Sequence, residues 1–174
     1  IAALATTQVS GLTAAQIGSL STTNLAAISP TAVASLSTTQ IAGLSVNQLK
    51  GLSAADFAEF KDTQIAVLAS TQIAALSATN FSALDATAAG ALTATQLKGV
   101  TATELKGLSA ADLAEFKDTQ IAVLASTQIA ALSATNFSAL DATALGALTA
   151  TQPKGVTATQ LKGLTATALA DLSS

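Results

Sequence analysis

Large apolar residues recur along this chain at a fixed interval of eight residues. When Leu4 is taken as position a, octads with positions a to h continue without insertion to the end of the chain. Position a is apolar in every octad, and position f is Ile, Leu, Val or Phe everywhere except at Ala89 and Pro153. A fixed period of this kind is the signature of a repeat architecture.

A longer repeat lies over the octad. The segment 50–103 recurs as the segment 106–159, a shift of seven octads. We therefore predict one continuous octapeptide-repeat solenoid over residues 1–174 that contains a tandem duplication. The two copies differ at only three pairs of positions, which are Phe57/Leu113, Ala89/Leu145 and Leu97/Pro153.

An eight-residue period excludes several regular structures. At about 100° per residue, a continuous α-helix would rotate its apolar stripe by about 80° in each octad, so no single face would stay buried. A coiled coil needs a period of seven or eleven. In a continuous strand, positions a and f would point to opposite faces because they are five residues apart. A β-solenoid remains the alternative fold.

One short helix per octad explains the polar positions. Position b is usually Ser, Thr or Asp, and position e is usually Gln, Asn, Asp or Glu. This spacing is the capping box, with b as the N-cap, and it makes a and f the two residues of a hydrophobic staple. Where b is Ala or Lys, we expect position c to supply the N-cap instead. Those position-c residues are Thr6, Asp62, Ser70, Asp118 and Ser126.

The end of each octad carries helix-stop signals. All ten glycines lie at g or h, and five of them follow a lysine. We expect these glycines to end the helices in the left-handed conformation. Pro30 fits the first helical position, whereas Pro153 at position f should fray its octad. The sequence thus predicts an all-α solenoid of helices about five or six residues long. It does not give the number of octads per coil, for which we assume two, stacked as helix pairs.

Composition and charge exclude most chemistry. The net charge is −3 and the chain has no Arg, which does not favour nucleic acid binding. No apolar run is long enough for a membrane span. Cys and His are absent, so disulfides, thiolate metal sites and a Ser–His catalytic pair are excluded. We predict a protein that is not an enzyme, with no catalytic, cofactor-binding or metal-binding residues.

Two surface features merit a specific interpretation. Acidic triplets occur at Asp56, Glu59 and Asp62 and at the duplicated positions 112, 115 and 118. We interpret them as helix caps and salt-bridge partners of Lys61 and Lys117, in preference to a weak Ca²⁺ site. Threonine recurs at position d, and we interpret these residues either as a ladder that bonds adjacent octads or as an exposed binding array.

The five Phe residues lie at a or f and are predicted to fill the core.

The octad pattern [LIV]-[ST]-x-T-Q-[IL]-x-x resembles the Ala/Thr/Ser-rich octapeptide arrays of large bacterial surface or secreted proteins, which are described as adhesin-like or haemagglutinin-like. The resemblance extends over the whole chain and implies a rod, stalk or filament body outside the cell. No His, Met, Cys or Tyr is present to ligate a haem iron. The expected partner is a second copy, bound head to tail or side by side through uncapped repeats. The alternative is a binding module that presents Thr rows to ice or glycan.

Overall fold

A computed structural model describes residues 5–149 and 151–172, and its helices confirm the predicted all-α fold. In these residues no strand occurs, so the β-solenoid alternative is wrong. Each α-helix has four to six residues and begins at position c of its octad. The helices are α1 (Thr6–Ser10), α2 (Ala14–Gly18), α3 (Thr22–Ala26), α4 (Pro30–Ser35), α5 (Thr38–Ala42), α6 (Val46–Lys50), α7 (Ala54–Phe57), α8 (Asp62–Ile65), α9 (Ser70–Ile73), α10 (Ala78–Ser82), α11 (Ala86–Ala91), α12 (Ala94–Gly99), α13 (Ala102–Gly107), α14 (Ala110–Ala114), α15 (Asp118–Ile121), α16 (Ser126–Ala131), α17 (Ala134–Ser138), α18 (Ala142–Gly146), the 3-10 helix η1 (Pro153–Gly155), α19 (Ala158–Gly163) and α20 (Ala166–Asp171).

A complete capping box, with both of its hydrogen bonds, starts eight of the α-helices in the described residues. In α2, the Thr13 hydroxyl accepts a hydrogen bond from the Gln16 amide at 3.2 Å, and the Gln16 side-chain oxygen accepts one from the Thr13 amide at 2.8 Å. Pro30 occupies the first position of α4, as predicted. The expectation for octads with Ala or Lys at b is wrong. There the N-cap stays at b without a side-chain bond, because the position-e glutamine still binds the N-cap amide, as in Lys61 to Gln64 at 2.8 Å.

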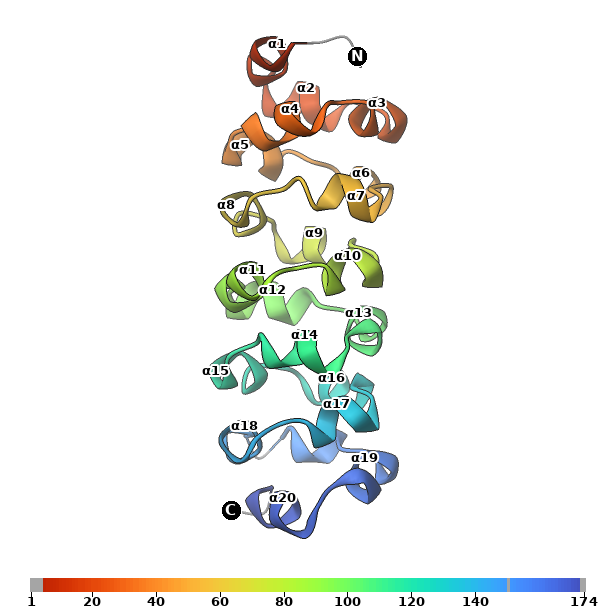
Figure 1. The fold of residues 1–174 in the computed structure, drawn as a ribbon, viewed down its shortest axis with the longest axis vertical. Helices are drawn as coiled ribbons and strands as arrows, with labels where there is room; N and C mark the ends of the chain where they lie inside the picture. Colours follow the sequence, from red (N-terminus) through yellow and green to blue (C-terminus); the bar gives the residue numbers. More distant parts are fainter. Residues whose placement is uncertain (1–4, 150, 173–174) are drawn as a thin grey trace.

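The helices wind into an elongated rod with its ends at opposite poles (Figure 1). Neighbouring coils meet through helices three octads apart, such as α1 with α4, α2 with α5 and α10 with α13. Position-e side chains reach further back, to carbonyls 28 to 31 residues earlier. One coil therefore contains between three and four octads, so the assumption of two octads per coil is wrong. A helix of one turn exposes too much of its apolar surface for a pair to close a core.

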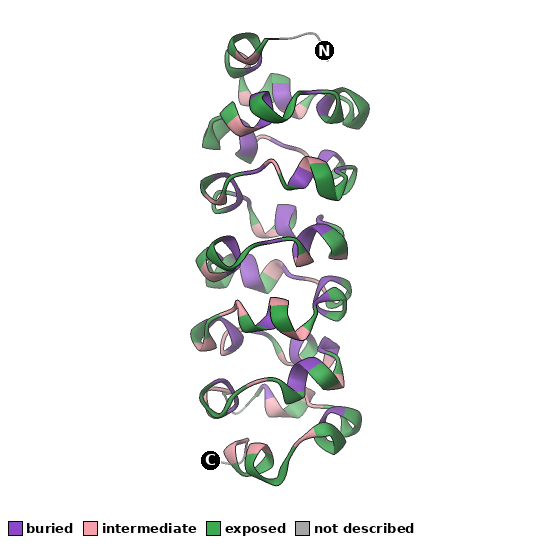
Figure 2. Cartoon of the chain, in the orientation of Figure 1, coloured by how far each residue is buried: buried purple, intermediate pink, exposed green. Residues whose placement is uncertain are grey.

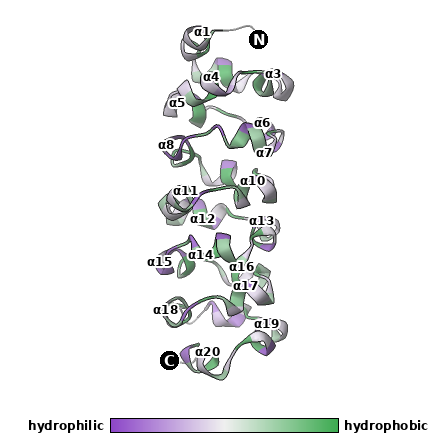
Figure 3. Ribbon diagram, in the orientation of Figure 1, coloured by the Kyte–Doolittle hydropathy of each residue, from purple (hydrophilic) through white to green (hydrophobic). Residues whose placement is uncertain are grey.

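The core runs along the axis of the rod. Residues at a and f form one continuous cluster of buried side chains, in which Ile17, Ile41 and Ile129 are fully buried. Buried residues occupy the inner side of the coils, and hydrophobic residues recur along the rod (Figures 2 and 3). Four of the phenylalanines are buried as predicted, whereas Phe116 is half-buried and stacks on Phe81 of the preceding coil, with ring centroids 6.1 Å apart. Leu4, the first position-a residue, lies outside the described residues.

The glycines at position h do not end the helices in the left-handed conformation, so that prediction is wrong. No glycine among the described residues has a positive φ, and Gly43 and Gly51 have φ values of −79° and −87°. Instead, position h lies against position c of the helix three octads earlier. A Cβ atom at Gly99 would lie 2.3 Å from the Ser70 carbonyl oxygen, and one at Gly107 would lie 2.7 Å from Ala78 Cβ. Glycine is required here because adjacent coils approach closely.

Pro153 interrupts one octad, as predicted. The described residues of this octad contain the 3-10 helix η1 in place of an α-helix. In the other octads the position-f amide donates to the carbonyl of the N-cap, as Leu97 does to Thr93 at 2.9 Å, and proline has no N–H for this bond. The interruption is local, because Gln152 still donates to the Ile121 and Leu124 carbonyls at 3.0 and 2.7 Å.

The close approach of coils predicts unequal effects for the same substitution. Gly99→Ala should lower the free energy of unfolding by about 1–3 kcal/mol, because the new methyl group would force the two coils apart. Gly146→Ala is the matched control, since nothing lies within 4 Å of its Cβ position. It should be neutral or stabilise by about 0.5–1 kcal/mol. Urea unfolding followed by circular dichroism measures both, and equal effects would contradict this account of position h.

Candidate functional site

The most regular polar feature of the structure is a line of buried side-chain amides at position e. All eleven glutamines of the chain occupy this position. From Gln40 onward each of them is buried, whereas Gln8 and Gln16 in the first coil are exposed. Buried amides need partners for both the oxygen and the nitrogen, because an unsatisfied polar group in the core costs about 1–3 kcal/mol.

Each buried glutamine connects its own helix to the preceding coil. In α16, the Gln128 oxygen accepts from the Ala125 amide at 2.8 Å, while its nitrogen donates to the Leu97 and Val100 carbonyls at 2.7 Å each. We call this set of side chains the amide ladder. Its members with a recorded bond to the preceding coil are Gln40, Gln48, Gln64, Gln72, Asn80, Gln96, Gln120, Gln128, Asn136, Gln152 and Gln160.

The amide ladder supplies partners to both ends of short helices. A helix of five residues has more unpaired terminal groups than internal hydrogen bonds. The glutamine oxygen accepts from the N-cap amide of one helix, and its nitrogen donates to carbonyls in the last turn of another helix or just after it. The sequence predicted the first half of this arrangement and missed the second. The preference for Gln over Glu at position e was the available signal, because a capping box accepts either residue whereas only Gln is also a donor.

Glu104 is the one ladder position filled by a glutamate. It is 1% exposed, its Oε2 accepts from the Thr101 amide, and its Oε1 has no hydrogen-bond partner. Its counterpart seven octads later is Gln160, whose nitrogen donates to the Ile129 and Leu132 carbonyls at 2.8 and 2.9 Å. A carboxylate cannot make those bonds. Burial raises the pKa of the Glu104 carboxyl, against the opposing effect of its hydrogen bonds with Thr101.

Asp112 shows how an acid at position e is accommodated. Its Oδ2 accepts from the Ser109 amide at 2.8 Å and from the Ser82 hydroxyl at 2.7 Å. Ser82 belongs to the preceding coil, so a hydroxyl donor now meets an acidic acceptor. Burial disfavours the charged form, but the hydrogen bonds from Ser109 and Ser82 outweigh it and hold the pKa of Asp112 below its usual range. Glu104 has no such donor.

Two cavities with the same lining lie seven octads apart in the chain. The first, of about 120 Å³, is lined by Phe60, Asp62 and Asp85 among others, and the second, of about 130 Å³, is lined by the equivalent residues of the second copy. Every residue that lines the first cavity has its counterpart in the wall of the second. A third cavity, of about 140 Å³, is lined in part by Asp56, Glu59 and Phe60. The duplication of the sequence has therefore duplicated an acidic, partly apolar cavity.

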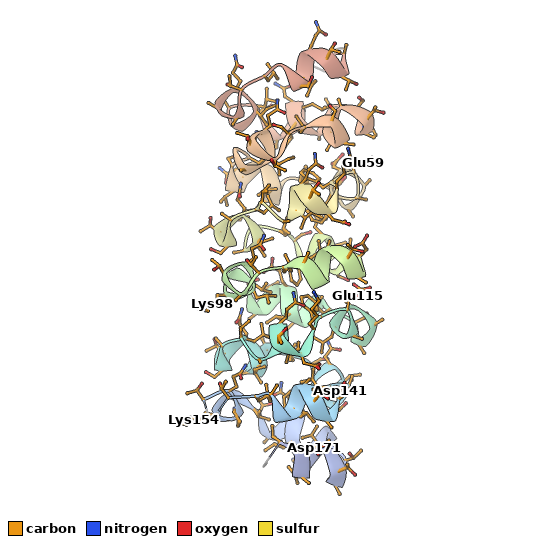
Figure 4. All side chains as sticks on the ribbon, turned by 90° about the vertical axis from the view of Figure 1, so that its left-hand side faces the viewer. Glu59, Lys98, Glu115, Asp141, Lys154 and Asp171 are labelled. Atoms are coloured by element: carbon orange, nitrogen blue, oxygen red, sulfur yellow. The ribbon has the colours of Figure 1, made fainter. Side chains whose placement is uncertain are left out.

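Some charged residues lie on opposite sides of the rod. Figure 4 shows Glu59, Glu115 and Asp141 on one side and Lys98 and Lys154 on the other. Six of the ten acidic residues line the three cavities, and no lysine does. Lys98 and Lys154 are seven octads apart and lie one above the other (Figure 4). Seven octads therefore make a whole number of coils, and with three to four octads in each coil that number is two.

The predicted salt bridges are not formed. Within residues 5–149 and 151–172, neither Lys61 nor Lys117 makes a recorded ion pair within 4.0 Å. Asp62 and Asp118 do lie in the first turns of α8 and α15, as expected of capping acids. The same residues contain no group of three or more acidic side chains arranged to hold a metal ion.

The position-d threonines are all exposed among the described residues. Of their hydroxyls there, only that of Thr151 has a recorded side-chain partner, Thr149 of its own octad at 3.4 Å. The structure therefore gives no support to a threonine ladder between octads, and it presents these side chains to solvent.

No helix in the described part of the chain is long and apolar enough to cross a membrane. Comparison with known proteins finds no family that matches the chain, and no curated protein or solved structure with detectable similarity to it.

The ladder predicts opposite changes in the free energy of unfolding for two substitutions. Glu104→Gln should raise the free energy of unfolding at pH 7 by about 1–3 kcal/mol, because it restores donors to the preceding coil. Gln160→Glu should lower it by a similar amount. Since the folded-state pKa of Glu104 is raised, the folded chain binds the proton more tightly than the unfolded chain. The wild type therefore loses stability relative to Glu104→Gln as the pH rises above about 4.5, the ordinary glutamyl value.

Urea unfolding of the wild type and both variants between pH 4 and pH 8 measures these differences. The gap between wild type and Glu104→Gln should be small at pH 4 and should widen toward neutrality. A gap that is independent of pH would show that the Glu104 carboxyl is not the cause.

Proposed function

We propose that this chain is a structural repeat protein that forms the body of a rod, stalk or filament in an extracellular bacterial polymer or adhesin. The observation that carries the proposal is the amide ladder, whose members from Gln40 to Gln160 join successive coils through the same kind of hydrogen bond. A stack held by nearest-neighbour contacts extends in one dimension with no upper limit set by the fold. The surface offers small acidic cavities and rows of hydroxyls, and the chain has no His or Cys for catalysis.

The first coil supports continuation of the stack. The Gln8 and Gln16 oxygens cap their own helices at 2.8 Å, but their nitrogens donate to no carbonyl among the described residues. Another coil stacked on this surface would supply the carbonyls. We propose that the last coil of a second copy occupies that place and gives head-to-tail growth.

The rod proposal predicts lengths that scale with repeat number. Insertion of one or two further copies of the segment 106–161 should lengthen the particle by equal increments at constant width, because each copy adds two coils. Negative-stain electron microscopy and small-angle X-ray scattering measure length and cross-section. Insertion of six and a half octads is the control, since it breaks the octad register and should disrupt the rod. Compact particles, or increments that are unequal, would overturn the proposal.

The exposed position-d threonines favour a second candidate, a module that binds ice or glycan through regular hydroxyl rows. A glycan array and a thermal hysteresis assay test it. If a ligand binds there, Thr23→Val, Thr79→Val and Thr135→Val together should weaken binding at least tenfold, because these threonines are seven octads apart on one face, and valine keeps the shape of threonine but has no hydroxyl. The helical circular dichroism spectrum should not change. A wild-type chain inactive in both assays would refute this candidate.

A further inference from the structure

The two equivalent cavities and the lysines on the opposite side share one spacing along the rod. The cavity containing Asp62 and Asp85 is related to the cavity containing Asp118 and Asp141 by a shift of seven octads. Lys98 and Lys154 are related by the same shift. Since the shift corresponds to two coils, the axial distance between the cavities equals the axial distance between the lysines.

The lysines are placed to reach another molecule. Lys98 lies in the last turn of α12 and Lys154 lies in η1, and both are exposed on the side of the rod opposite Asp141 (Figure 4). Within residues 5–149 and 151–172, neither side chain makes a recorded hydrogen bond or ion pair. An ammonium group on a flexible apolar stem is suited to a cavity whose walls are apolar and whose rim is acidic.

We infer that copies of this chain associate side by side, in parallel, with Lys98 and Lys154 of one copy inserted into the two acidic cavities of the next. This inference deepens the proposed structural function and rests on it. Two interactions of matched spacing engage together, so the second forms at a high effective concentration. The contact joins the cavity face of one copy to the lysine face of another. In a pair of copies, one cavity face and one lysine face therefore remain unoccupied. Further copies can therefore add, and rods become layers.

The dimensions of the cavities agree with this occupant. Each cavity, of about 120 to 130 Å³, has room for several water-sized groups and therefore for the end of a lysine side chain. The stem would contact Phe60 in one cavity and Phe116 in the other, while the ammonium would lie between two aspartates. Lys61 and Lys117 begin α8 and α15 close to the rims but line neither cavity, so they leave the acidic walls accessible.

Sedimentation velocity in 20 mM and 500 mM NaCl tests the inference. The wild type should form species that grow with concentration at low salt and should be at least tenfold less associated at high salt. Lys98→Gln with Lys154→Gln should abolish this growth, as should Asp85→Asn with Asp141→Asn, a change that retains an N-cap residue. An equimolar mixture of these two variants has one intact pair of surfaces and should stop at a one-to-one dimer.

The matched control is Lys61→Gln with Lys117→Gln, which removes the same charge from lysines with the same seven-octad spacing. This variant should associate at least as strongly as the wild type. The inference is overturned if the wild type stays monomeric at low salt, if the control loses association as completely as the Lys98 and Lys154 variant, or if the mixture does not form the dimer. Small-angle scattering at 500 mM NaCl separates the two proposals, because a monomeric rod there upholds the proposed function even when lateral association fails.

Discussion

The structure depends on one interaction, in which a position-e amide binds its own helix through its oxygen and the preceding coil through its nitrogen. Helices of four to six residues do not persist alone, because nucleation is unfavourable and most of their backbone groups are terminal. In this chain one side chain can bind groups at the start of one helix and at the end of another, as Gln128 does with Ala125, Leu97 and Val100. Helix formation and coil stacking are therefore coupled wherever a ladder amide is present.

Local features were predictable from the sequence, and distances between coils were not. The octad predicted the helix, its N-cap at b, the staple formed by a and f and the core, since each depends on residues within eight positions of one another. The coil length depends on contacts at separations of 28 to 31 residues, for which a perfect octad gives no register. The glycines illustrate the same limit. Their place at the helix end suggested a left-handed stop, but a contact with the coil three octads earlier requires them.

Substitutions at position e show how strongly the ladder constrains chemistry. Asp112 is tolerated because Ser82 in the preceding coil provides a hydrogen. Glu104 has only the Thr101 amide and leaves one oxygen unpaired, whereas its counterpart Gln160 keeps both bonds. At the acidic cavities, by contrast, Asp85 and Asp141 need only be residues that can cap a helix, and the opposing Lys98 and Lys154 are exposed. The interior thus fixes the rod, and the surface is available to vary.

The length of the duplication, seven octads, corresponds to two complete coils. A single octad added to the rod would rotate everything beyond it by roughly a third of a turn, so side chains that had shared a face would diverge. Seven octads close two coils, and the acidic side and the lysine side return to alignment. Recombination between near-identical gene segments offset by this unit would then produce longer and shorter proteins with the same lateral surfaces. Such molecules could be incorporated into one polymer regardless of their length.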